Sequence, residues 1–143
     1  MSGVTGLADL LASMNPELSG EEVVFCSFPH APVGDELLRS ALGFFREREG
    51  ITLIVARANA ERHGLPFHVT LRAITLTVHS SLEAVGFTAA VASRLAAHGI
   101  SANVVAACYH DHIFVPASEA ERALQILQAL QTEASDSRRA SSS

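Results

Sequence analysis

The pattern of hydrophobic and polar positions is clearest in the second half of the chain. Residues 74–78 alternate apolar and polar side chains, as a half-buried β-strand does. Apolar positions from about Leu82 to His98 recur at helical spacing, and Gly99 ends that pattern as a helix C-cap would. The pattern therefore predicts a strand and a helix, with a connecting loop over residues 79–86 at the carboxyl end of the strand.

A hairpin and a last helix follow in the pattern. Residues 100–109 and 112–115 predict two paired strands. Ser118 and the glutamate three positions later form a capping box for a final helix. The chain then ends in SDSRRASSS, a composition typical of disorder, so residues 133–143 are expected to be a disordered tail.

The first half is less regular. It predicts a lead-in helix over residues 6–14, a strand over residues 22–28 and a helical turn over residues 35–40. It then predicts a hairpin of residues 42–48 and 51–57, a short helix over residues 59–63 and a further extended stretch from Phe67 onward.

Both halves fit the split βαβ, ferredoxin-like plan. The predicted fold class is α+β, with two ferredoxin-like βαββαβ units that have antiparallel sheets, over residues 1–70 and 71–132. The second unit lacks an obvious fourth strand. Its strand over residues 74–78 would keep one unpaired edge unless the other half or a partner subunit covers it.

Three segments carry a family resemblance. In the order HSSLEAVGF, AAHGISANVV and YHDHIFVP, the chain resembles the small tandem ACT-like domain proteins of bacteria, over nearly all residues before the tail. The resemblance implies two ACT-like halves, and ACT domains commonly bind amino acids or other small effectors between two domains. Two such halves leave no room for a catalytic domain, so we expect that the protein is not an enzyme.

The resemblance also implies where a ligand would bind. ACT domains usually bind it at the loop between the first strand and the first helix. Many regulatory ACT domains open this loop with an acidic residue and a Pro-Gly pair, which His79-Ser80-Ser81 replaces here, so the position of the site transfers but the identity of the ligand does not. The implied ligand-binding residues are His79, Ser80, Ser81, Leu82, Glu83, Ala84, Val85, Gly86, Phe87 and, on the following strand, Asn103.

Physical chemistry supports the same loop. Free backbone N–H groups and the positive end of a helix dipole can hold a small anion there. Ser80 and Glu83 stand at capping-box spacing, which is compatible with structural capping, ligand contact, or both. Gly86 indicates either close approach of a ligand or close packing of the helix.

Other chemistry finds less support. His110-Asp111-His112 could contribute to a metal site, but its two histidines flank a predicted hairpin turn and Asp is a common turn residue. Three or four convergent ligands are not evident, so we favour polar residues of a turn or an interface and expect no metal. Neither GxSxG nor a Walker loop nor GxGxxG occurs. No catalytic residue and no cofactor is predicted.

Composition narrows the class of protein. A hydrophobic fraction of 48% and a charged fraction of 17% indicate a folded globular chain. A net charge of −5, with ten dispersed arginines as the basic residues, argues against a nucleic-acid surface. Cys26 and Cys108 have no CxxC partner and are expected to be small buried side chains. Without a membrane-span pattern or a signal peptide, we expect a cytoplasmic protein.

These features predict a non-catalytic protein that binds a small metabolite, with an amino acid favoured, and that forms a homodimer. An unidentified protein target is a further partner that they allow. Two alternatives stay open. One is a structural or protein-interaction module without a ligand, and the other is a histidine-based metal-binding protein or small hydrolase.

Overall fold

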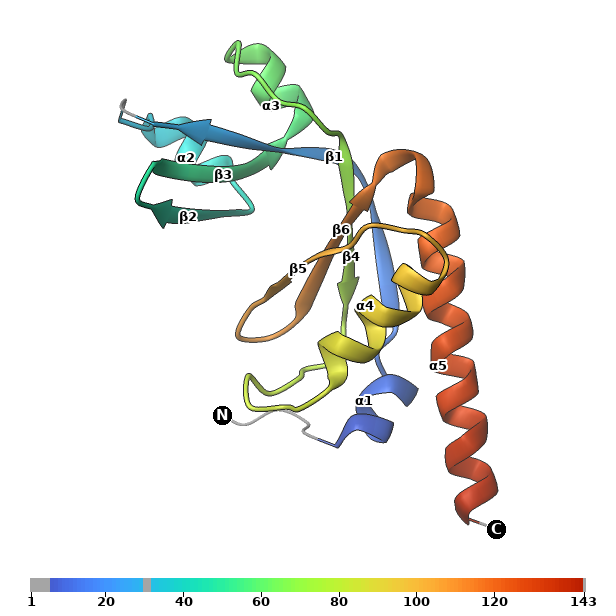
Figure 1. The fold of residues 1–143 in the computed structure, drawn as a ribbon. Helices are drawn as coiled ribbons and strands as arrows, with labels where there is room; N and C mark the ends of the chain where they lie inside the picture. The colour runs from blue at the N-terminus through green and yellow to red at the C-terminus, as the bar shows by residue number, and fades with distance from the viewer. Residues whose placement is uncertain (1–5, 30–31, 143) are drawn as a thin grey trace. The chain divides into compact units, whose positions relative to one another are not determined.

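The computed structural model describes residues 6–29 and 32–142, with side chains as far as residue 140 (Figure 1). The described elements, in chain order, are α1 (Leu7–Ala12), β1 (Pro16–Phe28), α2 (Asp35–Ser40), β2 (Gly43–Glu47), β3 (Gly50–Ala56), α3 (Arg57–Arg62), β4 (Leu71–Leu76), α4 (Phe87–Ala97), β5 (Asn103–Ala106), β6 (Asp111–Pro116), the 3-10 turn η1 (Ala117–Glu119) and α5 (Ala120–Ser142).

The chain forms two compact units that differ from the predicted division. Unit 1 takes the chain up to Ser19 and again from Ala73 onward, and unit 2 is Gly20–Arg72. The chain therefore passes between the units within β1 and again within β4. Residues 6–19, predicted to belong to the N-terminal half, lie in the unit built mainly from the second half.

In unit 1 the start of β1 is followed by β4, β6 and β5 in the order of the strands. The antiparallel pair β5–β6 places Asn103 opposite Phe114 and Ala106 opposite Asp111. Ile74 and Leu76 are buried on β4 while Thr75 between them is half-buried, as a strand with one core face requires. Those two side chains pack in one core with residues of α1, α4, β6 and α5 and of the segments that directly follow α1 and α4. The other buried members of this core are Leu10, Met14, Phe87, Val91, Leu95, Ile100, Ile113, Val115, Ala120, Ala123, Leu127 and Leu130.

The start of β1 supplies the fourth strand that the sequence pattern did not reveal. The Val78 N–H donates to the Met14 carbonyl at 3.3 Å, and Thr77 Oγ1 donates to the Asn15 carbonyl at 2.9 Å. Gln131 of α5 holds the same turn, because its Oε1 accepts the Asn15 N–H at 3.1 Å. The edge of β4 that was expected to be open is therefore covered by the chain itself.

In unit 2 the strand order is β2-β3-β1. β1 pairs with β3 from Val23 opposite Ala56 to Phe28 opposite Ile51, and β3 pairs with β2. One face of these strands packs with α2 and α3 in a small core of Val24, Cys26, Leu37, Leu53, Val55 and Ala60.

Three other boundaries differ from the sequence prediction. The extended stretch expected from Phe67 is not a strand, because β4 begins at Leu71 and runs as one strand to Leu76. The helix expected from about Leu82 begins at Phe87. The final capping box gives way to the turn η1, which follows Pro116 without a side-chain cap.

The tail also differs, since α5 continues as a helix to Ser142 where disorder from residue 133 was expected. Arg94 of α4 forms an ion pair with Glu133, and Arg138 lies 3.3 Å from Asp9 of α1. Arg139 and Asp136 add a pair at i,i+3 spacing along the helix. A polar composition alone did not show these partners, which lie far away in the sequence.

Candidate functional site

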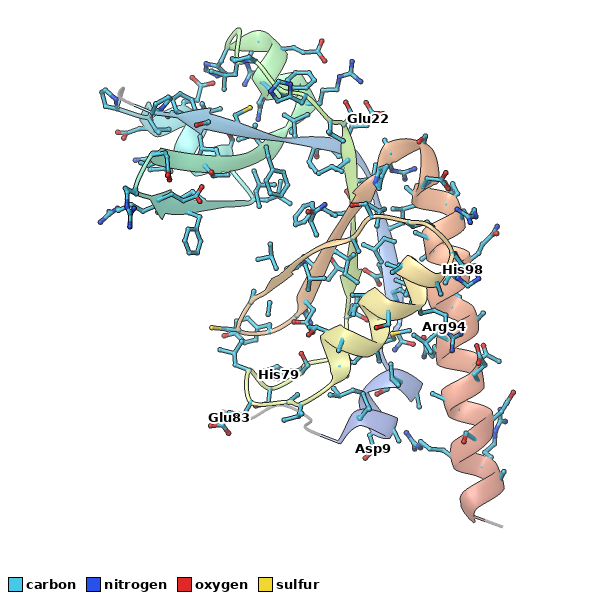
Figure 2. The ribbon with its side chains drawn as sticks, viewed as in Figure 1. Asp9, Glu22, His79, Glu83, Arg94 and His98 are labelled. Carbon is cyan, nitrogen blue, oxygen red and sulfur yellow. The ribbon has the colours of Figure 1, made fainter. Side chains whose placement is uncertain are left out.

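The loop that carries the predicted site joins β4 to α4 in unit 1. Figure 2 shows His79 and Glu83 on this loop, and the side chain of Glu83 points away from the ribbon. His79, Ser81, Ala84 and Gly86 are half-buried, and Glu83 is exposed. The structure therefore brings the segment His79 to Gly86 together as one surface loop at the carboxyl end of β4.

A buried polar pair fastens the start of this loop to β6. Ser80 and Asp111 are each 4% exposed, and Ser80 Oγ donates to Asp111 Oδ2 at 3.2 Å. Burial raises the pKa of the Asp111 carboxyl, while the Ser80 hydrogen bond and then the positive charges of His112 and His110 act in the opposite direction. Ser80 is thus a structural anchor whose hydroxyl is already engaged.

The two histidines beside Asp111 contact β4 and the residues that follow it, not each other. His110 Nδ1 lies 3.3 Å from the Val78 carbonyl, and His112 Nδ1 lies 3.0 Å from Thr75 Oγ1. Burial lowers the pKa of His112; the charge of His110 lowers it further and that of Asp111 opposes the shift. The HDH segment therefore works as a set of side-chain links between β6 and the end of β4.

A second contact reaches the loop from the β5–β6 turn. The rings of His79 and Tyr109 are tilted at 48° with their centroids 5.5 Å apart, within the centroid distances at which aromatic rings attract each other. Tyr109 remains 63% exposed. One side of the loop is thus formed by a turn more than twenty residues later in the chain.

The middle of the loop is a closed turn rather than the start of a helix. Ser81 Oγ accepts the Glu83 N–H at 3.1 Å, and the Ala84 N–H donates to the Ser81 carbonyl at 3.0 Å. The predicted capping box between Ser80 and Glu83 is wrong, because α4 begins only at Phe87: Ser81 accepts the Glu83 N–H within a turn, and Ser80 bonds to Asp111.

Gly86 ends the loop and begins α4. It has a left-handed φ of 89°, a conformation that costs glycine little, and a Cβ there would lie 3.6 Å from Leu7 Cδ2 of α1. The N-cap residue is itself Gly86, which has no side chain to cap the helix, and no acidic residue occupies the first turn of α4. The first N–H groups of α4 thus lack the carboxylate that commonly neutralises a helix N-terminus.

The remaining predicted residues divide into three groups. Leu82 and Val85 are 67% and 83% exposed on the outside of the loop, whereas Phe87 is only 2% exposed and packs in the core. Asn103 is not brought to the loop. It pairs with Phe114 at the far end of the hairpin, and its Nδ2 donates to the Phe114 carbonyl at 3.3 Å.

Sequence reasoning did not include Asp111, His110 and Tyr109 among the site residues. The signal was present, because the split βαβ plan makes the first and third strands of a unit neighbours, and that adjacency places residue 111 beside residue 80. The sequence pattern of the HDH segment indicates a metal motif or polar residues of a turn or an interface. Its side-chain partners on β4 could not be inferred from spacing.

Metal and thiol chemistry have little basis here. In the described parts of the chain, no three His, Cys, Asp or Glu side chains converge as a metal site would require. Cys26 is buried, which raises the pKa of its thiol, but Cys108 is exposed in the β5–β6 turn, so the expectation that both are buried is wrong for Cys108. None of the described helices has both the length and the apolar run that a bilayer crossing requires.

Comparison with known proteins gives two matches to one family. Residues 2–72 match the ACT domain, and residues 69–129 match the ACT domain a second time. A search of the curated proteins gave no match.

Solved structures agree with this assignment. The chain is similar to a Vibrio cholerae protein of unknown function, described as a possible transport protein, at 48% identity and a TM-score of 0.76, over 87% of this chain and 95% of that one. Its fold is also similar to an Agrobacterium tumefaciens protein (12% identity, TM-score 0.65, 81% and 87% of the two chains). A third similar fold is the regulatory subunit of aspartate kinase from Thermus thermophilus (11% identity, TM-score 0.57, 83% and 98%).

ACT domains are regulatory modules that typically bind amino acids. With an ACT match in each half, an α+β fold with antiparallel strand pairs and a strand–loop–helix element in the expected position, this chain belongs to the ACT domain family and carries two ACT domains in tandem.

Proposed function

We propose that the protein is a non-catalytic regulatory module of the cytoplasm that binds a free amino acid at the loop His79 to Gly86 of unit 1, and that it forms a homodimer. The single observation that carries the proposal is the uncapped N-terminus of α4, which opens directly from this loop in an ACT domain. The helix dipole and the first free N–H groups favour a bound carboxylate at that position.

The loop also offers complementary groups for the other end of an amino acid. The Glu83 side chain is exposed on the same turn and can accept hydrogen bonds from an ammonium group. Ser80 and Phe87 have structural roles in the proposed site, because both side chains are buried. Ser80 bonds to Asp111 and Phe87 packs in the core. Asn103 is left out of the proposed site because the register of β5 and β6 places it opposite Phe114.

A ligand screen tests this proposal. Thermal unfolding of the full chain would be followed with each common amino acid at millimolar concentration, and calorimetry would measure the affinity of any that stabilise the protein. We expect at least one to raise the melting temperature. Ser81→Arg, which places a long side chain over the turn, should weaken that binding about tenfold or more, equivalent to about 1.4 kcal/mol.

Two variants make the result specific. Ser101→Arg adds the same side chain at an exposed position of unit 1 before β5, and it should leave the affinity unchanged. Ser81→Ala removes only the hydroxyl that accepts the Glu83 N–H, which separates loss of the turn from obstruction of the site. The proposal fails if no amino acid stabilises the protein, or if Ser81→Arg and Ser101→Arg bind equally well.

One observation favours a second function, that of a protein-interaction module. Leu82 and Val85 expose large apolar surfaces at the tip of the same loop. A protein target could cover them without any ligand. A partner that co-purifies in fixed stoichiometry, and that is lost on Leu82→Ser whether or not amino acids are present, would support this function instead.

A further inference from the structure

The exposed apolar surface of unit 1 is concentrated at the loop between β4 and α4. The large apolar side chains that the described residues of this unit leave exposed are Leu7, Leu82, Val85, Val105 and Tyr109. Two of them belong to the loop itself, two more lie against it, and the fifth is Val105 on β5. Single apolar side chains are ordinary on a protein surface, whereas a group of them at one place commonly marks a binding site.

The two side chains from outside the loop reach its opposite ends. Tyr109 of the β5–β6 turn contacts the ring of His79, where the loop begins. Leu7 of α1 lies where the loop ends, because a Cβ on Gly86 would be 3.6 Å from the Leu7 Cδ2. The apolar group therefore extends along the loop as far as the N-terminus of α4, where the ligand carboxylate is proposed to bind.

The charges around this loop disfavour a ligand with an acidic side chain. Figure 2 shows Glu83 on the loop and Asp9 on α1, and both are carboxylates. The loop, the first turn of α4 and the β5–β6 turn contain no arginine, and the chain has no lysine. A second carboxylate on the ligand would lie near like charges without an arginine or lysine to pair with, which is unfavourable.

A basic side chain on the ligand is also poorly served. It would compete with the ligand ammonium group for Glu83, which the proposed function assigns to that group. Asp9 is already engaged, because Arg138 of α5 lies 3.3 Å from its Oδ1. A charged side chain would also cover the exposed apolar group at the cost of its own hydration.

We propose that the amino acid bound at this loop has a large apolar side chain, aliphatic or aromatic, and that the ring of Tyr109 contacts this side chain and determines the specificity; this inference rests on the proposed function. Binding would remove the apolar surfaces of the ligand and of Tyr109 from water together, which is favourable. Tyr109 is suited to this contact because its ring is 63% exposed while its contact with His79 holds it beside the loop.

Calorimetry of the full chain with five amino acids tests the ligand class. Leucine and phenylalanine carry large apolar side chains, alanine a small one, and aspartate and lysine charged ones. We expect leucine or phenylalanine to bind about tenfold or more tightly than alanine, because burial of a large apolar side chain adds to the affinity. Aspartate and lysine should bind more weakly than the better of the two apolar ligands.

Variants of Tyr109 test its role in specificity. Tyr109→Ala should weaken binding of the better apolar ligand about fivefold or more and leave the alanine affinity unchanged, because the alanine side chain is too short to gain from the ring. Tyr109→Phe keeps the ring and should keep the preference. Phe45→Ala removes a ring that is 70% exposed in unit 2, and it should leave every affinity unchanged.

The outcomes separate this inference from the proposed function. Binding of aspartate or lysine as tight as that of leucine and phenylalanine would overturn the inference while amino acid binding stands. An unchanged affinity for the apolar ligand in Tyr109→Ala, or an equal loss for that ligand and for alanine, would do the same, because either result removes Tyr109 from the choice of ligand. If none of the common amino acids binds, the proposed function itself fails and the inference fails with it.

Discussion

The two ACT domains share a fold plan but bury cores of different sizes. Among the described residues, the core cluster of unit 1 has fourteen buried members and that of unit 2 has six. The helices explain the difference, because α4 and α5 have 11 and 23 residues whereas α2 and α3 have six each. Burial of apolar area is the main favourable term in folding, so unit 2 has less of it to offset the entropy of ordering its chain.

The difference in core size shows which residues each unit uses to complete its core. Unit 1 recruits residues from outside its own repeat, since Leu10 and Met14 of the lead-in segment are fully buried in its core. Unit 2 relies on a tight hairpin, and it leaves apolar side chains exposed along β2. These exposed side chains are apolar surface that the smaller unit does not bury by itself.

The largest expected effect on stability comes from removing a side chain that the lead-in helix α1 contributes to the core of unit 1. Leu10→Ala removes a fully buried side chain from the core, and we expect it to lower the free energy of unfolding by about 2–5 kcal/mol. Chemical denaturation followed by circular dichroism would measure this. Leu7→Ala, one turn earlier on the same helix and 40% exposed, should cost much less. Equal, small losses for both variants would show that α1 is an appendage and not part of the core.

The reciprocal test acts on the hairpin of unit 2. Gly50 has a φ of +146°, and a Cβ there would lie 2.4 Å from the Phe28 carbonyl oxygen and 2.6 Å from Pro29 Cα. Gly50→Ala should therefore destabilise unit 2 by about 3 kcal/mol, from backbone strain and overpacking together. Gly34→Ala is the control in the same unit, because its added methyl group meets no atom of the described residues within 4 Å and its φ is −64°.

Native-state hydrogen exchange would assign this loss to a region. We expect faster exchange of the β2 and β3 amides in Gly50→Ala, with the α4 and α5 amides unchanged. If exchange rises equally in both units, the two domains unfold as one and the contrast between their cores has no energetic consequence.

The sequence was informative where the pattern is local. The alternation at residues 74–78 and the Gly99 stop predicted β4 and the end of α4. The three segments within residues 79–116 carried the resemblance to the ACT family, which the family match confirms. Long-range pairing was not visible in this way. Residues 16–19 carry no pattern that points to the β4 edge, because that contact depends on the Asn15 turn and on Gln131, more than a hundred residues away.

The loop shows the same limit at the scale of single side chains. Two adjacent serines have equal capping potential by sequence, and what separates them is Asp111, which engages Ser80 and leaves Ser81 to close the turn. Likewise, the residues around Asn103 form a strand as predicted, yet only the pairing register reveals that it lies far along the hairpin from Asp111.

The smallest expected effect concerns the pH dependence of unit 1, where two groups act with opposite signs. Burial lowers the pKa of His112 in the folded protein, so the unfolded chain binds its proton first and stability falls as pH drops through the unfolded value of about 6.5. Burial raises the pKa of Asp111, so its contribution is fully present below its unfolded value and is lost as pH rises through the folded one.

Two conservative variants separate these contributions. On acidification from pH 7.5 to 5.0, His112→Gln should lose stability less steeply than the wild type, because the group that resists protonation is gone. Asp111→Asn should lose stability more steeply, because it removes the negative charge that favours protonation of His112 in the folded protein. The free energy of unfolding from denaturant titrations at each pH provides the measurement. Slopes that change in the same direction in both variants would show that the Ser80–Asp111 anchor and its flanking histidines do not titrate as opposing groups, and that the acid sensitivity of the loop has another origin.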